Sequence, residues 1–597
     1  MTRLLPPSPG EGANRRGIKQ VTSIAHCYTN LDGTFSMTTI VTRQVDNAAF
    51  NTLVSQNVDP VMARLYAARG VASEQDLDTR MSALLAPALL AHIDAAAQFL
   101  AEAIQAKQKL LIVADYDADG ATACAVGMRA LSAMGAIVDF VVPDRFKYGY
   151  GLTPEIVALA ATKNPDIIIT VDNGIASVDG VAEANRRGIR VLVTDHHLPG
   201  DALPDAAVIV NPNQRGDTFA SKNLAGVGVI FYVMLALRAE LRRINYFVTL
   251  PEPNLADLLD LVALGTVADV VKLDHNNRVL VEQGLARVRA GRMCAGIRAL
   301  LQVAGRDHRR ATTYDFGFVV GPRINAAGRL EDMSIGIACL LADSDETANQ
   351  LAGQLDHLNR ERRVIEADMR DEALASLSEM NIGERFAIAI FEPTWHQGVV
   401  GILASRIREK YHRPVIAFAA DGNGNLKGSG RSIQGLHMRD ALDLITKRYP
   451  GMITKFGGHA MAAGLTISHN TLIDFAKAFE TVVRDLVSPN DLLEQLETDG
   501  AISADDLTFD FVNSLESQVW GQGFAAPSFT GAFKVVEQRV VGEKHLKLKL
   551  SLDGSTFDAI RFGSPDALNP SIDAVFRPSI NEFRGAKTLQ LMIDHTE

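Results

Sequence analysis

Carboxylate and imidazole side chains follow four apolar runs of this 597-residue sequence, at the point where each run ends. The runs are KLLIVA, DIIITV, RVLVT and LVALGTVA. Eight candidate side chains come after them: Asp115, Asp117, Asp119, Asp172, Asp195, His196, His197 and Asp269. A single Asp after a strand is commonly a helix cap, but several carboxylates crowded together repel and raise each other's pKa. We therefore expect a cation to hold the cluster together.

The types of these side chains indicate which cation is bound. Oxygen and imidazole ligands without thiolate favour Mn²⁺ or Mg²⁺ over a structural zinc. Their number indicates two divalent metal ions, which in two-metal sites lie about 3.5–4 Å apart and clamp a phosphoryl group during in-line displacement. DADG also resembles the start of an EF-hand loop, but a strand precedes it and no Glu follows at the required spacing. The sequence therefore predicts phosphoryl transfer rather than calcium binding.

The elements that position these side chains alternate between residues 108 and 270. Apolar runs rich in Ile and Val, separated by helical stretches, indicate a parallel sheet covered on both faces. In such a sheet, side chains at the carboxyl ends of separate strands converge on one edge. We read all four runs, including the one before Asp269, as segments that deliver their acids to this edge. The expected unit is an α/β catalytic domain over residues 37–343.

Beyond this domain the composition changes three times. Residues 344–380 contain no Pro and one Gly and are dense in Glu, Arg, Leu and Ala, which predicts a long connecting helix. Residues 381–485 begin with strand-like RFAIAIFEP and indicate a second, smaller α/β domain. Residues 490–597 look mostly β, because HLKLKLSL alternates and places Lys547 and Lys549 on one face. The predicted fold class is α/β, with two lobes and a C-terminal β-rich domain.

Composition and charge restrict the class of protein further. The net charge of −11 does not indicate nucleic-acid binding, but a local basic surface rather than the total decides that. Four scattered cysteines without CxxC spacing argue against a disulfide framework or a zinc ribbon, and favour a reducing cytoplasm. No stretch approaches the roughly 18 uninterrupted apolar residues that span a bilayer, so no membrane partner is expected.

The first residues, MTRLLPPSPGEGANRRG, lack the apolar core of a signal peptide. The segment is polar and rich in Gly and Pro. We expect residues 1–36 to be a disordered extension, or the product of an upstream start with Met37 as the true one.

The motifs together resemble a known family. DYDADG, VDNG, DHH and GTVADVV, in this order, resemble the four motifs of the DHH phosphoesterase superfamily. GPRINAAGR, WHQGVVGILASRI, GSGRS and GGHAMAAG are similar to motifs of the bacterial members that degrade single-stranded DNA from its 5′ end. The resemblance covers roughly residues 45–597. It implies that residues 381–485 are the DHH-associated substrate-binding domain and that residues 490–597 are an OB-like nucleic-acid-binding domain. One departure is Val113, where smaller members place a His that Asp115 would replace here.

The resemblance also implies roles at the metal site. The implied ligands are Asp115, Asp117, Asp119, Asp172, His196 and Asp269. Asp195 would orient the imidazoles, as metal-bound histidines usually require. His197 would contact the scissile phosphate. A water activated by the ions would attack phosphorus, so no protein nucleophile is needed.

The second lobe and its surroundings would hold the substrate. The candidate contacts are Arg145, Tyr148, Arg323, Asn325, Arg329, Trp395, Ser429, Arg431, His459, Lys547 and Lys549. In GSGRS, glycines let backbone N–H groups approach a phosphate while Arg431 grips it, which makes Ser429 and Arg431 a pocket for the 5′-terminal phosphate. Tyr148 and Trp395 could stack bases. Each residue also has a plainer interpretation: a turn glycine, a core aromatic, a solvated arginine or a lysine that blocks edge association.

The function implied is metal-dependent removal of mononucleotides from the 5′ end of single-stranded DNA, in recombination and repair. A single-strand-binding protein and a recombination helicase are the implied partners. One alternative is a DHH phosphodiesterase for pyrophosphate, cyclic dinucleotides or short oligonucleotides. The roughly 110 residues beyond the second lobe favour a polymer, because a long strand needs an extended track. Another alternative, a non-catalytic strand-binding protein, would be expected to lack the ligands.

Overall fold

The computed structural model describes residues 28–29, 35–36 and 38–597, apart from 249, 379, 381 and 584. Side chains of residues 28–36, 145, 146 and 583 are not described. The predicted contact of the Arg145 side chain and most of the predicted extension 1–36 therefore lie outside the described residues. Within that extension, Tyr28–Thr29 (β1) pairs antiparallel with Phe35–Ser36 (β2). Among the described residues, no one helix combines the length and apolar character that crossing a membrane needs, although the bent pair Met81–Leu89 and Ile93–Gln105 does so jointly.

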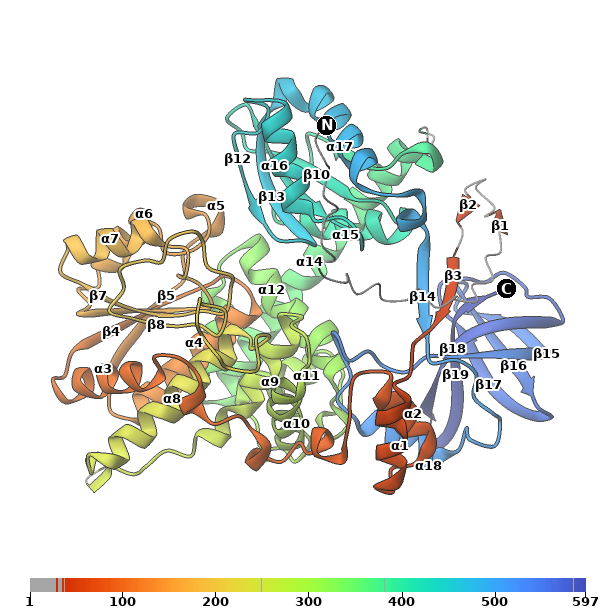
Figure 1. Cartoon of the computed structure of the whole chain (residues 1–597), viewed down its shortest axis with the longest axis horizontal. Helices are drawn as coiled ribbons and strands as arrows, with labels where there is room; N and C mark the ends of the chain where they lie inside the picture. Colours follow the sequence, from red (N-terminus) through yellow and green to blue (C-terminus); the bar gives the residue numbers. More distant parts are fainter. Residues whose placement is uncertain are drawn as a thin grey trace, which may run out of the picture.

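A five-stranded parallel sheet forms the centre of the first lobe (Figure 1). Its strands, in spatial order, are β5 (Ile137–Val141), β4 (Lys109–Ala114), β6 (Ile167–Val171), β7 (Arg190–Thr194) and β8 (Val208–Val210). β4, β6 and β7 are buried along almost their whole length. This burial explains why their sequences are continuously apolar rather than alternating.

Helices cover both faces of this sheet and extend the lobe. Their bounds are α3 (Ile93–Gln105), α4 (Ala118–Ala133), α5 (Arg145–Tyr148), α6 (Pro154–Ala161), α7 (Val178–Arg186), α8 (Gly226–Arg243), α9 (Leu259–Ala268), α10 (His275–Arg289), α11 (Ala295–Val303), α12 (Gly321–Leu330) and α13 (Ser334–Leu341). The first two helices, α1 (Asn47–Ser55) and α2 (Pro60–Ala67), lie instead beside the C-terminal domain (Figure 1). α3, α4 and α8 pack on one face of the sheet, whereas α6 and α7 pack on the other.

The structure corrects the prediction for the apolar run before Asp269. We expected it to behave like the strand runs, but it forms the helix α9, and Asp269 is the residue that caps its end. α9 is buried from Leu259 through Thr266. A helix surrounded by other helices is apolar on all sides, so its sequence loses the period that would distinguish it from a buried strand.

One long helix, α14 (Asp345–Ser378), leads from the first lobe to the second (Figure 1). The second lobe contains a five-stranded sheet in the order β12 (Lys455–Gly458), β13 (Ala462–Ser468), β11 (Asn425–Arg431), β10 (Val415–Ala420) and β9 (Ile388–Phe391). Its helices are α15 (Val400–Tyr411), α16 (Met438–Arg448) and α17 (Leu472–Leu486). α16 and α17 cover one face of the sheet, and α15 covers the other face over β9 and β10.

The C-terminal region forms a closed β-barrel, which the sequence did not specify beyond a β-rich, OB-like domain. Its strands, in spatial order, are β15 (Phe529–Val541), β16 (His545–Leu552), β17 (Ser555–Arg561), β19 (Ala586–Thr596) and β18 (Ser571–Phe583), and the helix α18 (Phe509–Ser517) packs beside β18. β16 is the predicted alternating strand, with its leucines buried inside the barrel. The predicted fold class, two α/β lobes with a β-rich end, is confirmed.

A strand near the N-terminus joins the barrel region rather than the sheet of the first lobe. β3 (Thr38–Thr42) pairs in parallel with β14 (Glu494–Thr498), although more than 450 residues separate them. Next to this pair, Arg69 binds Asp499 through its Nη1 atom at 2.7 Å, and the ion pair is almost fully buried. Breaking such a pair would leave a buried charge, which is strongly destabilising. The sequence analysis, which began the catalytic domain at residue 37, did not predict that this segment contacts the C-terminal region.

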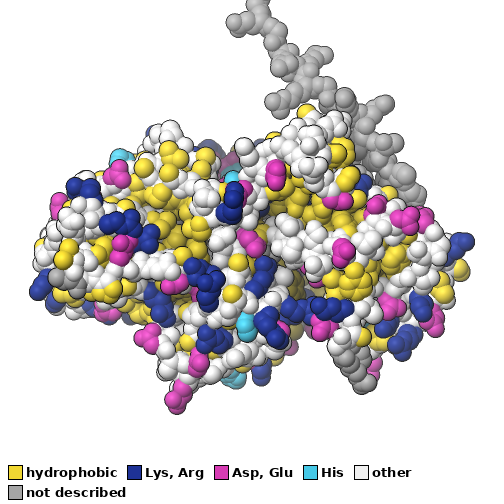
Figure 2. Space-filling model, turned by 90° about the horizontal axis from the view of Figure 1, so that it is seen from below, with side chains coloured by type: hydrophobic (Ala, Val, Ile, Leu, Met, Phe, Trp, Pro, Cys, Tyr) yellow, Lys and Arg dark blue, Asp and Glu magenta, His cyan; other side chains and the backbone are white. Residues whose placement is uncertain are grey.

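Charge is distributed unevenly over the surface. On the face seen from below, Lys and Arg side chains gather across the middle of the molecule, with Asp and Glu interspersed (Figure 2). A chain with a net charge of −11 therefore still presents local basic surface, which is what phosphate binding requires.

Candidate active site

Three parallel strands deliver acidic or imidazole side chains to one edge of the sheet. Asp115 follows β4, Asp172 follows β6, and Asp195 and His196 follow β7. Asp172 has a φ of +62°, and Val270, the residue after Asp269, has a φ of +64°. Positive φ is unusual for a residue with a Cβ and exceptional for a β-branched one, so the backbone is strained at both places.

The N-terminus of α8 stabilises one member of the cluster. Asp119 accepts hydrogen bonds from the backbone N–H groups of Gly226 (2.6 Å) and Val227 (2.9 Å). A Cβ on Gly226 would lie 2.6 Å from the Cβ of Asp172, so glycine allows the helix to approach both acids. Burial, then the charge of Asp117, raises the pKa of Asp119 to about 7. These two donors therefore offset only part of the cost of holding the carboxylate there.

His196 points a bare nitrogen at the acids. Its ring lies 3.1 Å from Asp172 Oδ1 and 3.6 Å from Asp269 Oδ2, measured from Nε2. Burial lowers the pKa of His196 to about 4, so the ring is neutral, and its hydrogen bond to the Leu224 backbone uses the other nitrogen as donor. Among the described residues, His196 Nε2 and Asp172 Oδ1 are both buried without a hydrogen-bond partner. Two lone pairs therefore face each other, and a cation between them satisfies both.

Three overlapping groups of potential ligand atoms each lie within 4.8 Å of one another. They are Asp115 with Asp117 and Asp172, Asp119 with His196 and Asp269, and Asp172 with His196 and His197. Asp172 belongs to two groups, so its carboxylate would help to hold a cation at either one. Burial, then the charge of Asp119, raises the pKa of Asp172 and of Asp269 well above the ordinary value. The donor set and its repulsion fit two divalent cations.

Asp195 orients His197 rather than His196. Its Oδ1 accepts from His197 Nδ1 at 2.8 Å, and its Oδ2 accepts from the Ile175 N–H at 2.9 Å. Burial lowers the pKa of His197, but the hydrogen bond to Asp195 and the charges of Asp195, Asp115 and Asp117 together outweigh it, so the pKa ends above the ordinary value. His197 is thus the more cationic of the two imidazoles, as a phosphate contact requires.

The sequence analysis missed Tyr150, which completes this part of the site. Its hydroxyl lies 3.2 Å from the ring nitrogens of His197 and donates to the Asp172 carbonyl at 3.4 Å. We selected Tyr148 from the same segment, RFKYGYG, but its ring is half-buried beside Lys147. The two tyrosines are equivalent in sequence, and only the turn between them decides which one reaches the cleft.

Ser429 and Arg431 lie together at the N-terminus of α15. Arg431 Nη1 donates to the Ser429 hydroxyl at 3.1 Å and to the Gly430 carbonyl at 2.8 Å. A Cβ on Gly401, in the first turn of α15, would lie 2.9 Å from Arg431 Nη2 and from Ser429 Oγ. Glycine at that position lets a hydroxyl, a guanidinium and helix N–H groups converge, which is an arrangement suited to an anion.

The sheet beside this pair has an open face. Gly457, Gly464 and Ser429 are register partners on β12, β13 and β11, and a Cβ on Gly457 would meet nothing within 4 Å. Helices cover the opposite face of these strands. His459, after β12, stacks on His197 of the first lobe with 6.3 Å between ring centroids. The predicted contacts Ser429, Arg431 and His459 therefore border the metal cluster from across the cleft.

The structure corrects two predicted substrate contacts. Arg323 is only 9% exposed, and its guanidinium forms an ion pair with Asp356 of α14 at 2.9 Å. Trp395 is 4% exposed, and its Nε1 donates to Glu372 at 2.9 Å. Both side chains hold α14 against its neighbours, and neither is available to a base or a phosphate.

Asn325 and Arg329 connect the site to the second lobe. Asn325 Oδ1 accepts from the Ala118 N–H at 2.8 Å, at the start of α4 between the two acids of the DADG motif. Arg329 Nη1 donates to the Gly398 carbonyl of the second lobe at 3.0 Å. The motif GPRINAAGR thus positions the metal-binding loop and the lobe interface.

The lysines of β16 are far less uniform in surroundings than the sequence indicated. Lys549 is exposed, but its register partners are the acids Glu537 and Asp558. Lys547 is half-buried and lies beside Arg539. Only the Lys547 end of this strand retains local positive charge.

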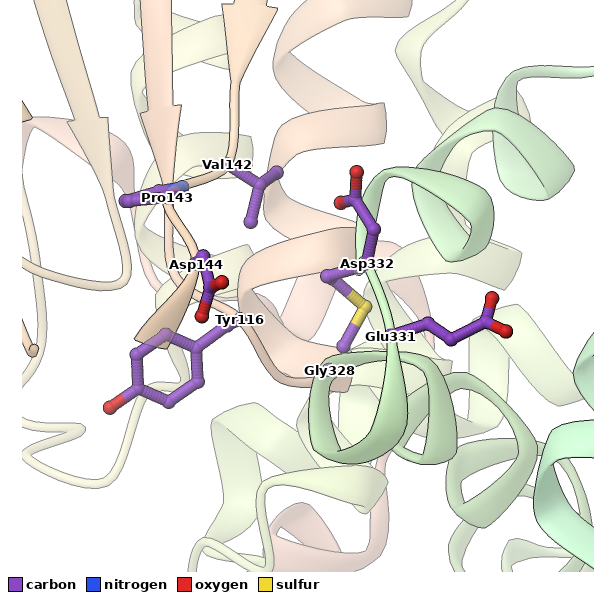
Figure 3. Close-up of a pocket in the computed structure, with 8 residues that line it drawn as sticks. Tyr116, Val142, Pro143, Asp144, Gly328, Glu331 and Asp332 are labelled. Atoms are coloured by element: carbon purple, nitrogen blue, oxygen red, sulfur yellow. The ribbon is translucent and has the colours of Figure 1, made fainter. Parts of the chain in front are cut away.

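An acidic pocket of about 140 Å³ borders the cluster beside Tyr116. Asp144 and Asp332 enter it from opposite sides, whereas Glu331 points away (Figure 3). Its lining is therefore acidic, which disfavours phosphate in this pocket.

Comparisons with known proteins agree with this geometry. The DHH family, N-terminal domain matches residues 109–266, the DHHA1 domain matches residues 383–485, and the RecJ OB domain matches residues 498–595. The chain is 47% identical over 570 residues to the single-stranded-DNA-specific exonuclease RecJ of Dickeya dadantii, covering 93% of this chain and 99% of that protein. It is also 47% identical to the Escherichia coli protein of that name, covering 93% and 98%. The chain belongs to the RecJ family.

Solved structures extend the comparison. The crystal structure of RecJ in complex with Mn²⁺ from Thermus thermophilus matches with a TM-score of 0.78 at 29% identity, covering 94% of this chain and 79% of that one. A second structure of that RecJ, in complex with Mg²⁺, matches with a TM-score of 0.73 at 28% identity, covering 93% and 77%. Family membership confirms the predicted superfamily, and these two ions are the ones that the donor set favours.

Proposed function

We propose that this chain is a metal-dependent exonuclease that hydrolyses single-stranded DNA from its 5′ end and releases mononucleotides. The observation that carries the proposal is the pair of buried atoms Asp172 Oδ1 and His196 Nε2, which face each other among further carboxylates. The name shared by the relatives, single-stranded-DNA-specific exonuclease, supports this substrate and reaction class.

The first lobe supplies the chemistry in this proposal. The residues that would hold the ions are Asp115, Asp117, Asp119, Asp172, His196 and Asp269. Two divalent ions bound there would stabilise charge on the phosphoryl oxygens and lower the pKa of water near phosphorus. His197, whose pKa Asp195 helps to raise, donates a hydrogen bond to a non-bridging oxygen of the scissile phosphate. Tyr150 fixes the direction of that imidazole.

The second lobe determines the 5′ to 3′ direction of the reaction in this proposal. Arg431, Ser429 and the N–H groups at the start of α15 bind the terminal 5′ phosphate. His459 of the same lobe lies against His197, so a strand held by Arg431 presents its first phosphodiester to the metal cluster. The open glycine face of β12 and β13 leaves room for the terminal sugar and base. Cleavage there releases one nucleotide at a time.

The wider setting rests on the family resemblance. The barrel at residues 498–595 is the proposed strand-binding module, and single-stranded DNA is the proposed partner. A single-strand-binding protein and a recombination helicase are further proposed partners. The cytoplasm, where bacterial DNA lies, is the proposed location.

The test is digestion of a 5′-labelled single-stranded oligonucleotide and of its duplex, in Mn²⁺ and in EDTA. We expect labelled mononucleotide from the single strand only, in Mn²⁺ only, and none from the Asp172→Ala variant. Asp260→Asn is the matched control, because Asp260 is an equally buried acid that accepts N–H groups of Cys294 and Leu261 outside the cluster. Turnover of pyrophosphate or dinucleotides with inert DNA would contradict the proposal.

A further inference from the structure

A basic groove lies beside the metal cluster, on the face of α12 that Asn325 and Arg329 share. It has a volume of about 470 Å³ and runs between α12, α14 and α15. Its charged lining consists of five arginines and a single acid, Glu366. Glu366 already binds Arg362 and also accepts from Arg406 Nε at 3.0 Å. The groove as a whole therefore keeps an excess of positive charge, which fits a polyanion.

Two aromatic rings stand exposed at one end of this groove. Phe318, which lines it, is 67% exposed, and Tyr314 is 56% exposed. Their rings are stacked, with 5.1 Å between centroids and 25° between planes. Phe318 lies in a π-helical turn, Asp315–Val320, and such turns are rare and frequently occur at functional sites. A stacked pair left in solvent is unusual, whereas every nucleobase has a flat face that could cover it.

The pair lies between the groove and the barrel. Arg306 places its guanidinium 5.7 Å from the Tyr314 ring centroid. On the barrel, the hydrogen bond to Asp594 raises the pKa of Arg577 in β18, and the nearby Tyr314 phenol contributes to the same rise. At the opposite end, the groove reaches Asn325, which binds the start of α4 at the metal cluster. The aromatic pair thus lies between the barrel residue Arg577 and the groove, where Arg306 pairs with Asp315 and Arg577 with Asp594.

We propose that Tyr314 and Phe318 form a stacking platform for bases on the 3′ side of the scissile nucleotide, while Arg363, Arg370 and Arg406 follow the phosphates. This inference rests on the proposed function and adds a length requirement to it. A strand long enough to reach the platform gains affinity, and a dinucleotide does not. The enzyme therefore prefers oligonucleotides over short fragments, independently of base sequence.

The kinetic test compares kcat/KM for a single-stranded 20-mer with kcat/KM for a dinucleotide, in Mn²⁺. We expect Phe318→Ala to lower the ratio of the 20-mer value to the dinucleotide value about tenfold. Phe318→Tyr should keep the wild-type ratio, because stacking tolerates any aromatic ring. Phe509→Ala, which removes a 41% exposed ring at the start of α18, should keep the wild-type ratio. A defect of folding lowers both substrates together, so an unchanged ratio in Phe318→Ala would overturn the inference.

A binding test needs no turnover. The Asp172→Ala variant is mixed with 20-mers that carry 2-aminopurine at successive positions from the 5′ end. We expect fluorescence quenching at one or two internal positions, and loss of that quenching when Tyr314→Ala and Phe318→Ala are added. Quenching that survives both substitutions would exclude the platform. If the wild-type chain degrades no oligonucleotide, the proposed function itself has failed, and this appears before any variant is compared.

Discussion

The acidic cluster of the first lobe and the Arg431 site of the second lobe form two walls of the cleft, and they stabilise their charged side chains differently. On the first lobe, Asp119 and Asp172 are each 1% exposed, and burial together with neighbouring acids raises the pKa of both. On the second lobe, Arg431 is half-buried, hydrogen-bonded to its own strand and set on a floor of glycines. The acids of the first wall thus repel one another in the absence of a cation. Arg431 of the second wall, in contrast, already has hydrogen-bond partners. Substitutions on the first wall should change chemistry and metal-free stability, and those on the second should change binding.

Asp172→Asn should have the largest effect on the reaction. It removes the charge shared by two groups of ligand atoms, and metal sites stabilise the transition state by several kcal/mol, so kcat should fall on the order of 10³-fold. Single-turnover release of mononucleotide in Mn²⁺ measures it. Wild-type kcat in this variant would remove Asp172 from the proposed ligands.

The same variant should be more stable than the wild type without metal. The folded-state pKa of Asp172 is raised, so ionisation costs the folded protein stability as pH rises through that value. In EDTA, Asp172→Asn should therefore raise the melting temperature, and the gain should grow as pH rises above the ordinary carboxyl pKa of 3.8. Burial also raises the pKa of Asp260, but its Oδ1 and Oδ2 each accept a backbone N–H, so an amide would turn an NH₂ donor toward one of them and Asp260→Asn should lower the melting temperature. A loss of stability in both variants would mean that the first wall is not strained.

Arg431→Ala should have the next largest effect, confined to binding. Hydrogen bonds to charged groups contribute about 1.5–3 kcal/mol, so KM for a 5′-phosphorylated strand should rise up to about 100-fold. A strand with a 5′ hydroxyl should lose much less, because it lacks the group that Arg431 binds. Lys477→Ala is the control, because Lys477 is 75% exposed on α17, behind the sheet. Equal losses on both strands would show that Arg431 does not read the terminal phosphate.

Asp195→Asn should reduce kcat about tenfold, in the range seen when partners of metal-site histidines are replaced. The amide can keep a contact to His197 but cannot hold it as a cation. Asp195 raises the pKa of His197 in the wild type, and the variant loses that effect. As pH rises, the remaining activity should therefore begin to fall at a lower pH than in the wild type. A pH–rate profile of kcat/KM measures the shift. An unchanged profile would separate Asp195 from the protonation of His197.

The difference between the walls also explains what the sequence could predict. Acids at the ends of β4, β6 and β7 were found because a parallel sheet places consecutive strand ends on one edge, so chain order alone brings them together. Tyr150, Gly226 and the Leu224 carbonyl reach the same cluster through turns and a helix end, and no sequence period marks them. Asp269 was expected in the cluster and lies there, but the run before it is a helix rather than a strand, since full burial removes the helical sequence pattern.

The sequence indicated which motifs form the second wall, but not which of their side chains are exposed to the cleft. GSGRS and GGHAMAAG carry local chemistry, and their residues do border the cleft. Arg323 and Trp395 belong to motifs of similar appearance, yet they face α14, where they bind Asp356, 33 residues away, and Glu372, 23 residues away. Which side of a helix meets solvent depends on what packs against it, and that partner is fixed only in the folded chain.

Trp395→Phe should have the smallest effect and tests this last point. The substitution keeps most of the buried ring but removes the Nε1–H donor to Glu372, so the free energy of unfolding should fall by about 1 kcal/mol. KM for the single-stranded 20-mer should stay at the wild-type value, because a ring that is 4% exposed cannot stack on a base. Urea unfolding and steady-state kinetics on the same preparation measure the two quantities. Unchanged stability with weaker strand binding would instead mean that the loop around Trp395 opens when DNA binds, and the tryptophan would then belong to the second wall after all.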